Sequence, residues 1–176
     1  MSTPQEIRDR LATRTRVSLA EVRRWMADDT SLELWSAVHK LLGPGWTLIR
    51  PEPDMDETCA FICRYLLRCI HENAQDHTRG LPTSYEAAHE LANTLKHWAT
   101  KLPDTHPALA SAEEMIASAY LAADPNERDR LLNGFLEHAL ESEPVRPYFQ
   151  HWAHHPSLAE PQRLAMEWAC PEKKPN

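Results

Sequence analysis

The stretch 125–141, PNERDRLLNGFLEHALE, constrains the fold most, because its apolar residues recur with the period of an α-helix. Residues three and four positions apart lie on one face of a helix. The apolar residues with this spacing are Leu131, Leu132, Phe135, Leu136, Ala139 and Leu140. Asp124 can accept a hydrogen bond from the first helical turn, and Pro125 suits the first helical position. We therefore predict a central packing helix over 125–141.

Gly134 interrupts this pattern in the middle of the predicted helix. A glycine inside a helix costs about 1 kcal/mol relative to alanine, so helix propensity does not favour it there. We expect another helix or a bulky ring to approach the backbone closely at Gly134.

The same helical period recurs along most of the chain, in segments that proline residues separate. The chain has 14 prolines and only 4 glycines, which fits helices joined by stiff connections. Further helices are predicted over 4–13, 19–26, 32–42, 54–75, 84–102, 107–122, 146–154 and 158–169. The stretch 46–50 is strand-like in composition, but it has no evident partner, and we interpret it as an extended connector.

Four of the predicted helix starts carry the spacing of a capping box. In that motif a serine or threonine and a glutamate three residues later satisfy each other's free backbone N–H groups. The pairs are Ser18 with Glu21, Thr30 with Glu33, Thr83 with Glu86, and Ser157 with Glu160. Together these patterns predict an all-α fold, a single compact domain over 1–170 with seven or eight helices in an orthogonal or antiparallel bundle. The tail 171–176 is predicted to be disordered.

The chain has no apolar run near the roughly 18 residues that a membrane helix needs, and its N-terminus carries charges where a signal peptide would be apolar. We therefore expect a cytoplasmic protein. Its four cysteines, Cys59, Cys63, Cys69 and Cys170, are too few for a disulfide framework in a chain of this length, so reduced thiols are expected.

Three groups of residues contain possible metal ligands, but each group lacks other features of a metal site. Glu86 and His89 have the spacing of ferritin-like ligands, but a second such pair is missing from the sequence. Cys59, Cys63 and Cys69 lie along one predicted helix with His71, where core packing is the simpler interpretation. The remaining group, His151, His154 and His155, has no cysteine or carboxylate partners at metal-ligand spacing. We predict no metal and no cofactor.

Two pairs satisfy the loose Arg-x(4–6)-His pattern and so resemble the helical HEPN ribonucleases. They are Arg64 with His71 and Arg146 with His151. Chance matches are expected among 14 arginines and 10 histidines. The segment 18–38 has the outline of a helix-turn-helix, but its acidic residues would repel phosphate, so nucleic-acid binding is not expected.

Negative charge is concentrated in one part of the chain. The stretch 104–144 contains nine acidic residues and only two basic ones, Arg128 and Arg130. Its excess of seven negative charges equals the formal charge of −7 for the whole chain. Such an acidic region favours a basic partner, because complementary charge speeds encounter and disfavours wrong partners.

The residues Asn133, Gly134, Phe135, Leu136 and Glu137 form a G-F-L-E-like segment in a late helix. In this respect the chain resembles, over about 85–140, a group of uncharacterised bacterial helical domains. Some members of that group are similar to small acidic immunity proteins that neutralise toxins. The resemblance implies a helical protein that acts by binding and contributes no catalytic residue.

The sequence therefore predicts a non-enzymatic protein-binding module, an immunity-type inhibitor of a basic bacterial toxin such as a nuclease. The expected contacts are acidic residues with aromatic anchors beside them. They are Glu113, Glu114, Asp124, Asp129, Glu137, Glu141, Glu143, Tyr148, Phe149 and Trp152. The alternative is a helical enzyme, either HEPN-like or metal-dependent, that uses one of the histidines.

Overall fold

The computed structural model describes residues 3–72, 80–103 and 106–170, and these residues are predominantly helical, as the sequence predicts. The helices are α1 (Pro4–Ala12), α2 (Leu19–Ala27), α3 (Leu32–Leu42), α4 (Met55–Glu72), α5 (Ser84–Lys101), α6 (Pro107–Ala122), α7 (Pro125–Asp129), η3 (Arg130–Leu136), α8 (Glu137–Leu140), α9 (Arg146–Phe149), η4 (Gln150–His154) and α10 (Ala159–Ala169). The 3₁₀ turn η1 (Trp46–Leu48) and the strands β1 (Val17–Ser18) and β2 (Ile49–Arg50) complete the described elements.

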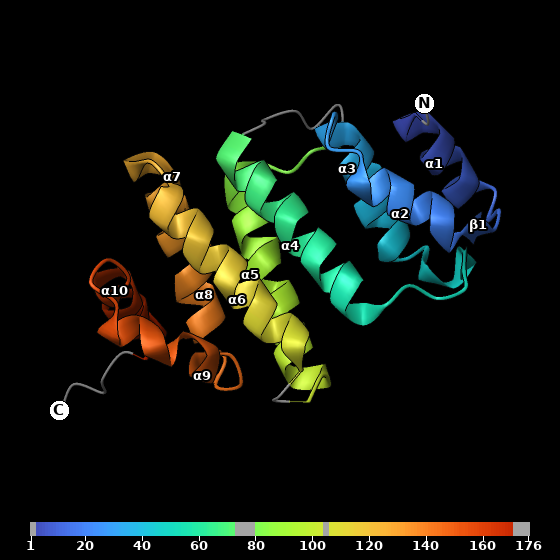
Figure 1. Cartoon of the computed structure of the whole chain (residues 1–176). Helices are drawn as coiled ribbons and strands as arrows, with labels where there is room; N and C mark the ends of the chain where they lie inside the picture. The colour runs from blue at the N-terminus through green and yellow to red at the C-terminus, as the bar shows by residue number, and fades with distance from the viewer. Residues whose placement is uncertain (1–2, 73–79, 104–105, 171–176) are drawn as a thin grey trace, which may run out of the picture.

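The long helices α4, α5 and α6 form the middle of the molecule (Figure 1). Helix α4 packs against both α5 and α6, while α5 also packs against η3 and α8. Helices α1 and α2 lie on α3 at one end, and α10 packs against α8 and η4 at the other. Buried apolar side chains, from Ile7 to Ala165, form the hydrophobic core.

Two predicted capping boxes are confirmed. The Ser18 and Thr83 side chains accept from the backbone of Glu21 and Glu86, whose carboxylates accept from the capping residues in return. Asp124 caps α7 as expected, with its Oδ1 2.8 Å from the backbone nitrogen of Glu127.

The other two predicted capping boxes are wrong. Helix α3 is capped by Ser31, one residue after Thr30, and its hydroxyl accepts from the backbone of Leu34. Helix α10 begins at Ala159 without a side-chain cap. Its Glu160 binds Arg163 instead, at 2.8 Å, and the backbone N–H of Ser157 donates to His155 Nδ1 at 3.2 Å.

The interpretation of 46–50 as an unpartnered connector is wrong in two respects. Residues Trp46–Leu48 form a 3₁₀ turn, and Ile49–Arg50 pair in parallel with Val17–Ser18. The ends of the predicted helix 54–75 and of the joint 77–82 fall partly outside the described residues, as does the tail 171–176. The assignment of 1–170 to one domain stays a prediction.

The predicted helix 125–141 is a continuous helical body with a π-helical middle, since α7, η3 and α8 follow one another without a break. Counted in this way, and with the adjoining α9 and η4 taken together, the part of the chain that the structure describes has nine helices, one for each predicted helical range and more than the predicted total of seven or eight. The apolar stripe packs into the core as expected, and Leu132 alone among its six residues is half-buried. Short π-helical stretches inside α-helices occur frequently at functional sites.

The expected close contact at Gly134 is confirmed. A Cβ atom added there would lie 2.9 Å from the Ala88 Cβ and 3.2 Å from the Tyr85 Cδ1 atom, both on α5. Contacts below 3.0 Å force something to shift, and the Ala88 methyl group is fixed to a helix backbone. Glycine therefore allows α5 and η3 to approach.

We predict that Gly134→Leu destabilises the protein by about 1–3 kcal/mol, because the added side chain overpacks the contact with Ala88 and Tyr85. Urea unfolding followed by circular dichroism measures this difference. Gly43→Ala is the matched control, since a Cβ there would have only ordinary contacts, 3.7 Å and 3.8 Å from backbone oxygens. Unchanged stability of Gly134→Leu would show that the contact is open.

Candidate functional site

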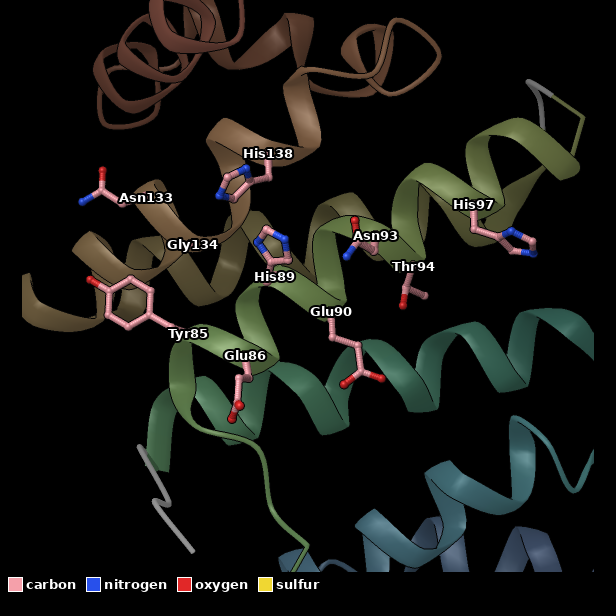
Figure 2. Close-up of a pocket in the computed structure, with 10 residues that line it drawn as sticks. All are labelled: Tyr85, Glu86, His89, Glu90, Asn93, Thr94, His97, Asn133, Gly134 and His138. Atoms are coloured by element: carbon pink, nitrogen blue, oxygen red, sulfur yellow. The ribbon is translucent and has the colours of Figure 1, made fainter. Parts of the chain in front are cut away.

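A groove with a volume of about 710 Å³ lies between α5 and the η3–α8 segment (Figure 2). We call it the α5–η3 groove. Its lining residues are polar or aromatic apart from Gly134: Tyr85, Glu86, His89, Glu90, Asn93, Thr94, His97, Asn133, Gly134 and His138. Many of those on α5 recur three or four positions apart, which places them along one side of that helix.

Tyr85 forms one end of the groove, and its side chain is exposed at 50%. The ring lies against the backbone of Gly134, and its hydroxyl donates to Asp129 Oδ2 at 3.3 Å. Asp129 Oδ1 accepts a second hydrogen bond from Asn133 Nδ2 at 2.7 Å. The missing side chain at Gly134 thus places an exposed aromatic ring beside an acidic residue.

Two histidines meet across the groove. The rings of His89 and His138 pack edge to face, with 4.4 Å between their centroids (Figure 2). His138 Nδ1 lies 3.5 Å from Glu141 Oε1, and Glu141 Oε2 accepts from Lys96 Nζ at 3.0 Å. The hydrogen bond from Lys96 holds the pKa of Glu141 below its usual value. These contacts connect α5 to α8.

Asp129, Glu137 and Glu141 border the η3–α8 side of the groove. Burial raises the pKa of Glu137, the nearby His138 lowers it, and the negative charges of Asp129 and Glu141 raise it by smaller amounts. Glu86 and Glu90 stand on the α5 side. Two carboxylates, Glu86 and Glu90, therefore line the groove, three more stand beside its lining residues, and Lys96 is bonded to one of these three, Glu141.

A second hollow of about 700 Å³ lies on the other side of Glu86 and Glu90, between α5, α3 and α4. We call it the α3–α5 cleft. His39 lines this cleft, and its Nε2 atom is 3.5 Å from Glu90 Oε1. The His39 ring packs on the Tyr65 ring, with 4.9 Å between the ring centroids. Burial lowers the pKa of His39 to about 4 and raises the pKa of Glu90. His39 is therefore neutral near pH 7 and does not neutralise Glu90.

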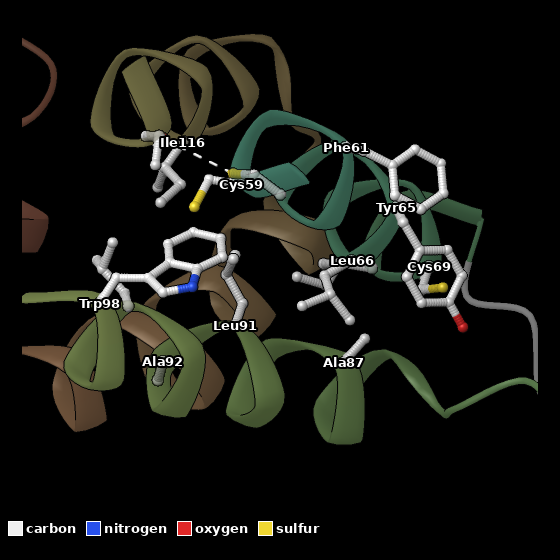
Figure 3. Packing of buried hydrophobic residues seen from close by; sticks show 14 of the residues in the cluster. Cys59, Phe61, Tyr65, Leu66, Cys69, Ala87, Leu91, Ala92, Trp98 and Ile116 are labelled. Carbon is white, nitrogen blue, oxygen red and sulfur yellow. Dashed lines mark hydrogen bonds between the residues drawn. The ribbon is translucent and has the colours of Figure 1, made fainter. Parts of the chain in front are cut away.

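The cysteines of α4 belong to the core, as the sequence predicts. Cys59, Cys63 and Cys69 are fully buried, and Cys69 lies beside Tyr65 (Figure 3). Burial raises the pKa of each of the three thiols to about 12, which leaves them without the thiolate that nucleophiles and metal ligands need. Among the described residues no three His, Cys, Asp or Glu side chains are placed to hold a metal ion.

Three of the predicted partner contacts are buried, which removes them from any docking surface. Glu113 accepts from the indole N–H of Trp152 and lies 3.4 Å from His151 Nε2. Trp152 and Phe149 are almost fully buried, with 5.1 Å between their ring centroids. The aromatic side chains of α9 and η4 are core anchors because they carry the largest apolar surfaces in that part of the chain.

The remaining predicted contacts are dispersed. Glu114 lies on α6 in a separate hollow beside Arg64 and Arg68, and Asp124 caps α7. Glu143 is exposed beyond α8, and Tyr148 is half-buried. Of the acidic residues singled out from the sequence, Asp129, Glu137 and Glu141 thus stand beside residues that line the groove, without lining it themselves.

The two Arg-His pairs singled out from the sequence have different surroundings in the structure. Arg146 donates to the Leu140 carbonyl at 2.8 Å and to the Glu141 carbonyl at 3.3 Å, so it holds the end of α8. Arg64 is exposed in a hollow between α4 and α6, while His71 lines the next hollow, and both hollows share Leu67 and Arg68. His71 Nδ1 lies 3.0 Å from Glu127 Oε2.

Comparison with protein-family models, with curated proteins and with solved structures found no match for this chain. Within residues 3–72, 80–103 and 106–170, no helix has the length and apolar character needed to span a membrane.

Sequence reasoning missed most of the α5 side of the groove. Glu86 and His89 stood out only as a partial metal motif, and Tyr85 and Glu90 did not stand out. The available signal was the polar row 85–97 opposite the apolar face of α5. That row shows an exposed helix face, but it does not show which other helix lies across from it.

We predict that His39 makes the protein less stable in acid. Its pKa is about 4 in the folded state and about 6.5 for a histidine in the unfolded chain, so the unfolded chain binds a proton more tightly and stability falls as the pH drops from 6.5 to 4. The loss amounts to at most about 3 kcal/mol. The raised pKa of Glu90 acts in the opposite direction, and His39→Gln leaves it in place.

The measurement is urea unfolding of the unchanged protein and of His39→Gln at about pH 7.5 and about pH 4.5. The variant should lose less stability between the two pH values. His154→Gln, at an exposed position, is the control and should match the unchanged protein. Equal acid sensitivity in all three proteins would contradict the prediction.

Proposed function

We propose that the protein is a non-enzymatic binding module whose α5–η3 groove takes a cationic segment of another protein. The observation that carries this proposal is the set of five carboxylates around the groove: Glu86, Glu90, Asp129, Glu137 and Glu141. Beside them, Tyr85 supplies an exposed aromatic ring of the kind that is enriched among binding hot spots.

The ionisation of the groove supports a cationic partner. Burial is the main cause of the raised pKa of Glu137, and repulsion from the charges of Asp129 and Glu141 adds to it, while the nearby His138 acts in the opposite direction. A bound lysine or arginine relieves that repulsion, and complementary charge also raises the rate of encounter. A basic bacterial toxin, such as a nuclease, is the partner that fits both this charge and the sequence resemblance.

A second candidate function is supported by the hollows between α4 and α6. His71 is exposed at 72%, while its partner Glu127 is exposed at 8%. A buried carboxylate that orients a histidine leaves the other ring nitrogen available as a general base. Arg64 and Arg68 line the adjoining hollow, so a phosphodiester could meet both a base and a cation there. This arrangement keeps the helical ribonuclease as the alternative.

We predict that Glu137→Lys/Glu141→Lys abolishes binding of a basic partner. A partner is first isolated from host lysate and identified, and its affinity is then measured by calorimetry with purified proteins at low salt. Loss of two attractive charges and gain of two repulsive ones should weaken binding by at least about a hundredfold, since close interfacial charge pairs are worth roughly 1.5 kcal/mol or more each.

The control is Glu52→Lys/Glu114→Lys, which changes the net charge equally at two exposed positions outside the groove. It should bind nearly as well as the unchanged protein. If both variants weaken binding equally, overall charge governs the affinity and the groove is not the site. If neither does, the acidic mechanism is wrong.

The alternative predicts cleavage of single-stranded RNA that depends on His71. In that case His71→Ala should abolish the appearance of RNA fragments on a gel, and His154→Ala, at another exposed histidine, should leave it unchanged. Cleavage that survives in His71→Ala would point to a contaminating nuclease. Binding of RNA without cleavage would also contradict this alternative.

A further inference from the structure

Glu86 and Glu90 form a ridge between the α5–η3 groove and the α3–α5 cleft. They lie four residues apart on α5, hence one above the other on the same face, and each lines both hollows. Figure 2 shows both carboxylates directed away from His89 and His138. A long side chain from a segment in the groove therefore needs to pass only this ridge to enter the cleft.

The wall of the cleft near Glu90 is suited to a flat cation. Glu90 Oε1 lies 3.5 Å from His39 Nε2, and the His39 ring packs on the buried Tyr65 ring. Because burial keeps His39 neutral, this contact brings no compensating charge to Glu90 near pH 7. The Glu90 carboxylate has the neutral His39 ring on one side and the Glu86 carboxylate on the other. A positively charged ligand would therefore stabilise it most.

Among the described residues Lys40 is the cation that lines the cleft, and its charge helps to keep the neighbouring His39 neutral. Lys40 Nζ approaches Gly80, where an added Cβ would be only 2.9 Å away. Ser36 Oγ donates to the Gly80 carbonyl at 2.9 Å. Of the described residues that line the cleft, Glu86 and Glu90 are acidic and Lys40 is basic, and an entering cation would settle at the carboxylate side, at Glu90.

We infer that the α3–α5 cleft is a pocket for the guanidinium group of one arginine of the bound segment, with Glu90 as its acceptor and His39 as a neutral neighbour. This inference rests on the proposed function, since the arginine belongs to the cationic segment in the groove. Guanidinium fits better than ammonium because it is planar, more weakly hydrated and able to bind a carboxylate through two parallel hydrogen bonds. The pocket would make the module selective for arginine over lysine.

The experiment uses the full chain with isotope-labelled histidine, so that NMR signals of His39 report on the cleft and those of His89 and His138 report on the groove. The probes are methylguanidinium, methylammonium and two peptides of equal length, one of arginines and one of lysines. Sodium chloride at matched ionic strength corrects for salt. Methylguanidinium should shift the His39 signals saturably, and methylammonium should do so more weakly.

Glu90→Gln should weaken the methylguanidinium response at His39 at least about tenfold, the usual effect of removing a charged hydrogen-bond partner. Glu114→Gln, which removes the same charge outside both hollows, should not weaken it. Both peptides should shift His89 and His138, and only the arginine peptide should also shift His39.

The outcomes separate this inference from the proposed function. If the peptides shift His89 and His138 but methylguanidinium and the arginine peptide leave His39 unchanged, the groove stands and the arginine pocket is overturned. An equal His39 response in Glu90→Gln also overturns the pocket. If methylguanidinium binds at His39 while neither peptide affects His89 or His138, the pocket stands and the groove is overturned as the docking site.

Discussion

The close approach of α5 to η3 at Gly134 is the contact on which the rest of the site depends. With no Cβ in the way, the Ala88 methyl group and the Tyr85 ring lie directly against the π-helical backbone. The same approach brings His89 to within 4.4 Å of His138, measured between ring centroids. A bulkier residue at this point would separate the two walls, because a packed helix interface cannot absorb several added atoms without moving.

Burial then decides what each ionisable group can do. Glu113 and Glu127 have the same charge as the groove carboxylates, but each is buried and bound to a specific partner, Trp152 or His71. Each of these two carboxylates is therefore already bound to a partner within the protein. The carboxylates around the groove are less buried and stand near other acids, so part of their charge is available to a partner. Sequence composition treats all of these acids alike, and only their surroundings distinguish them.

Local patterns predicted most helices because helix formation depends on residues within one or two turns. The Asp124 cap and the stripe from Leu131 to Leu140 illustrate this. The failures have equally physical causes. A Ser-x-x-Glu spacing permits a capping box but does not require one, and at Ser157 no such cap forms. The pairing of Val17 with Ile49 joins residues 32 positions apart, so neither short strand carries a local sign of its partner.

The sequence by itself determined the helical class of the fold and the need for a close contact at Gly134, because periodicity and glycine placement act locally. Only the tertiary structure decided which acidic residues come near one groove, since Glu86 and Glu90 line it from one helix and Asp129, Glu137 and Glu141 stand beside its lining residues on another segment. It also decided that Phe149 and Trp152 are buried. Net charge and aromatic content describe a segment, but the direction in which its side chains point is set by the helices packed against it.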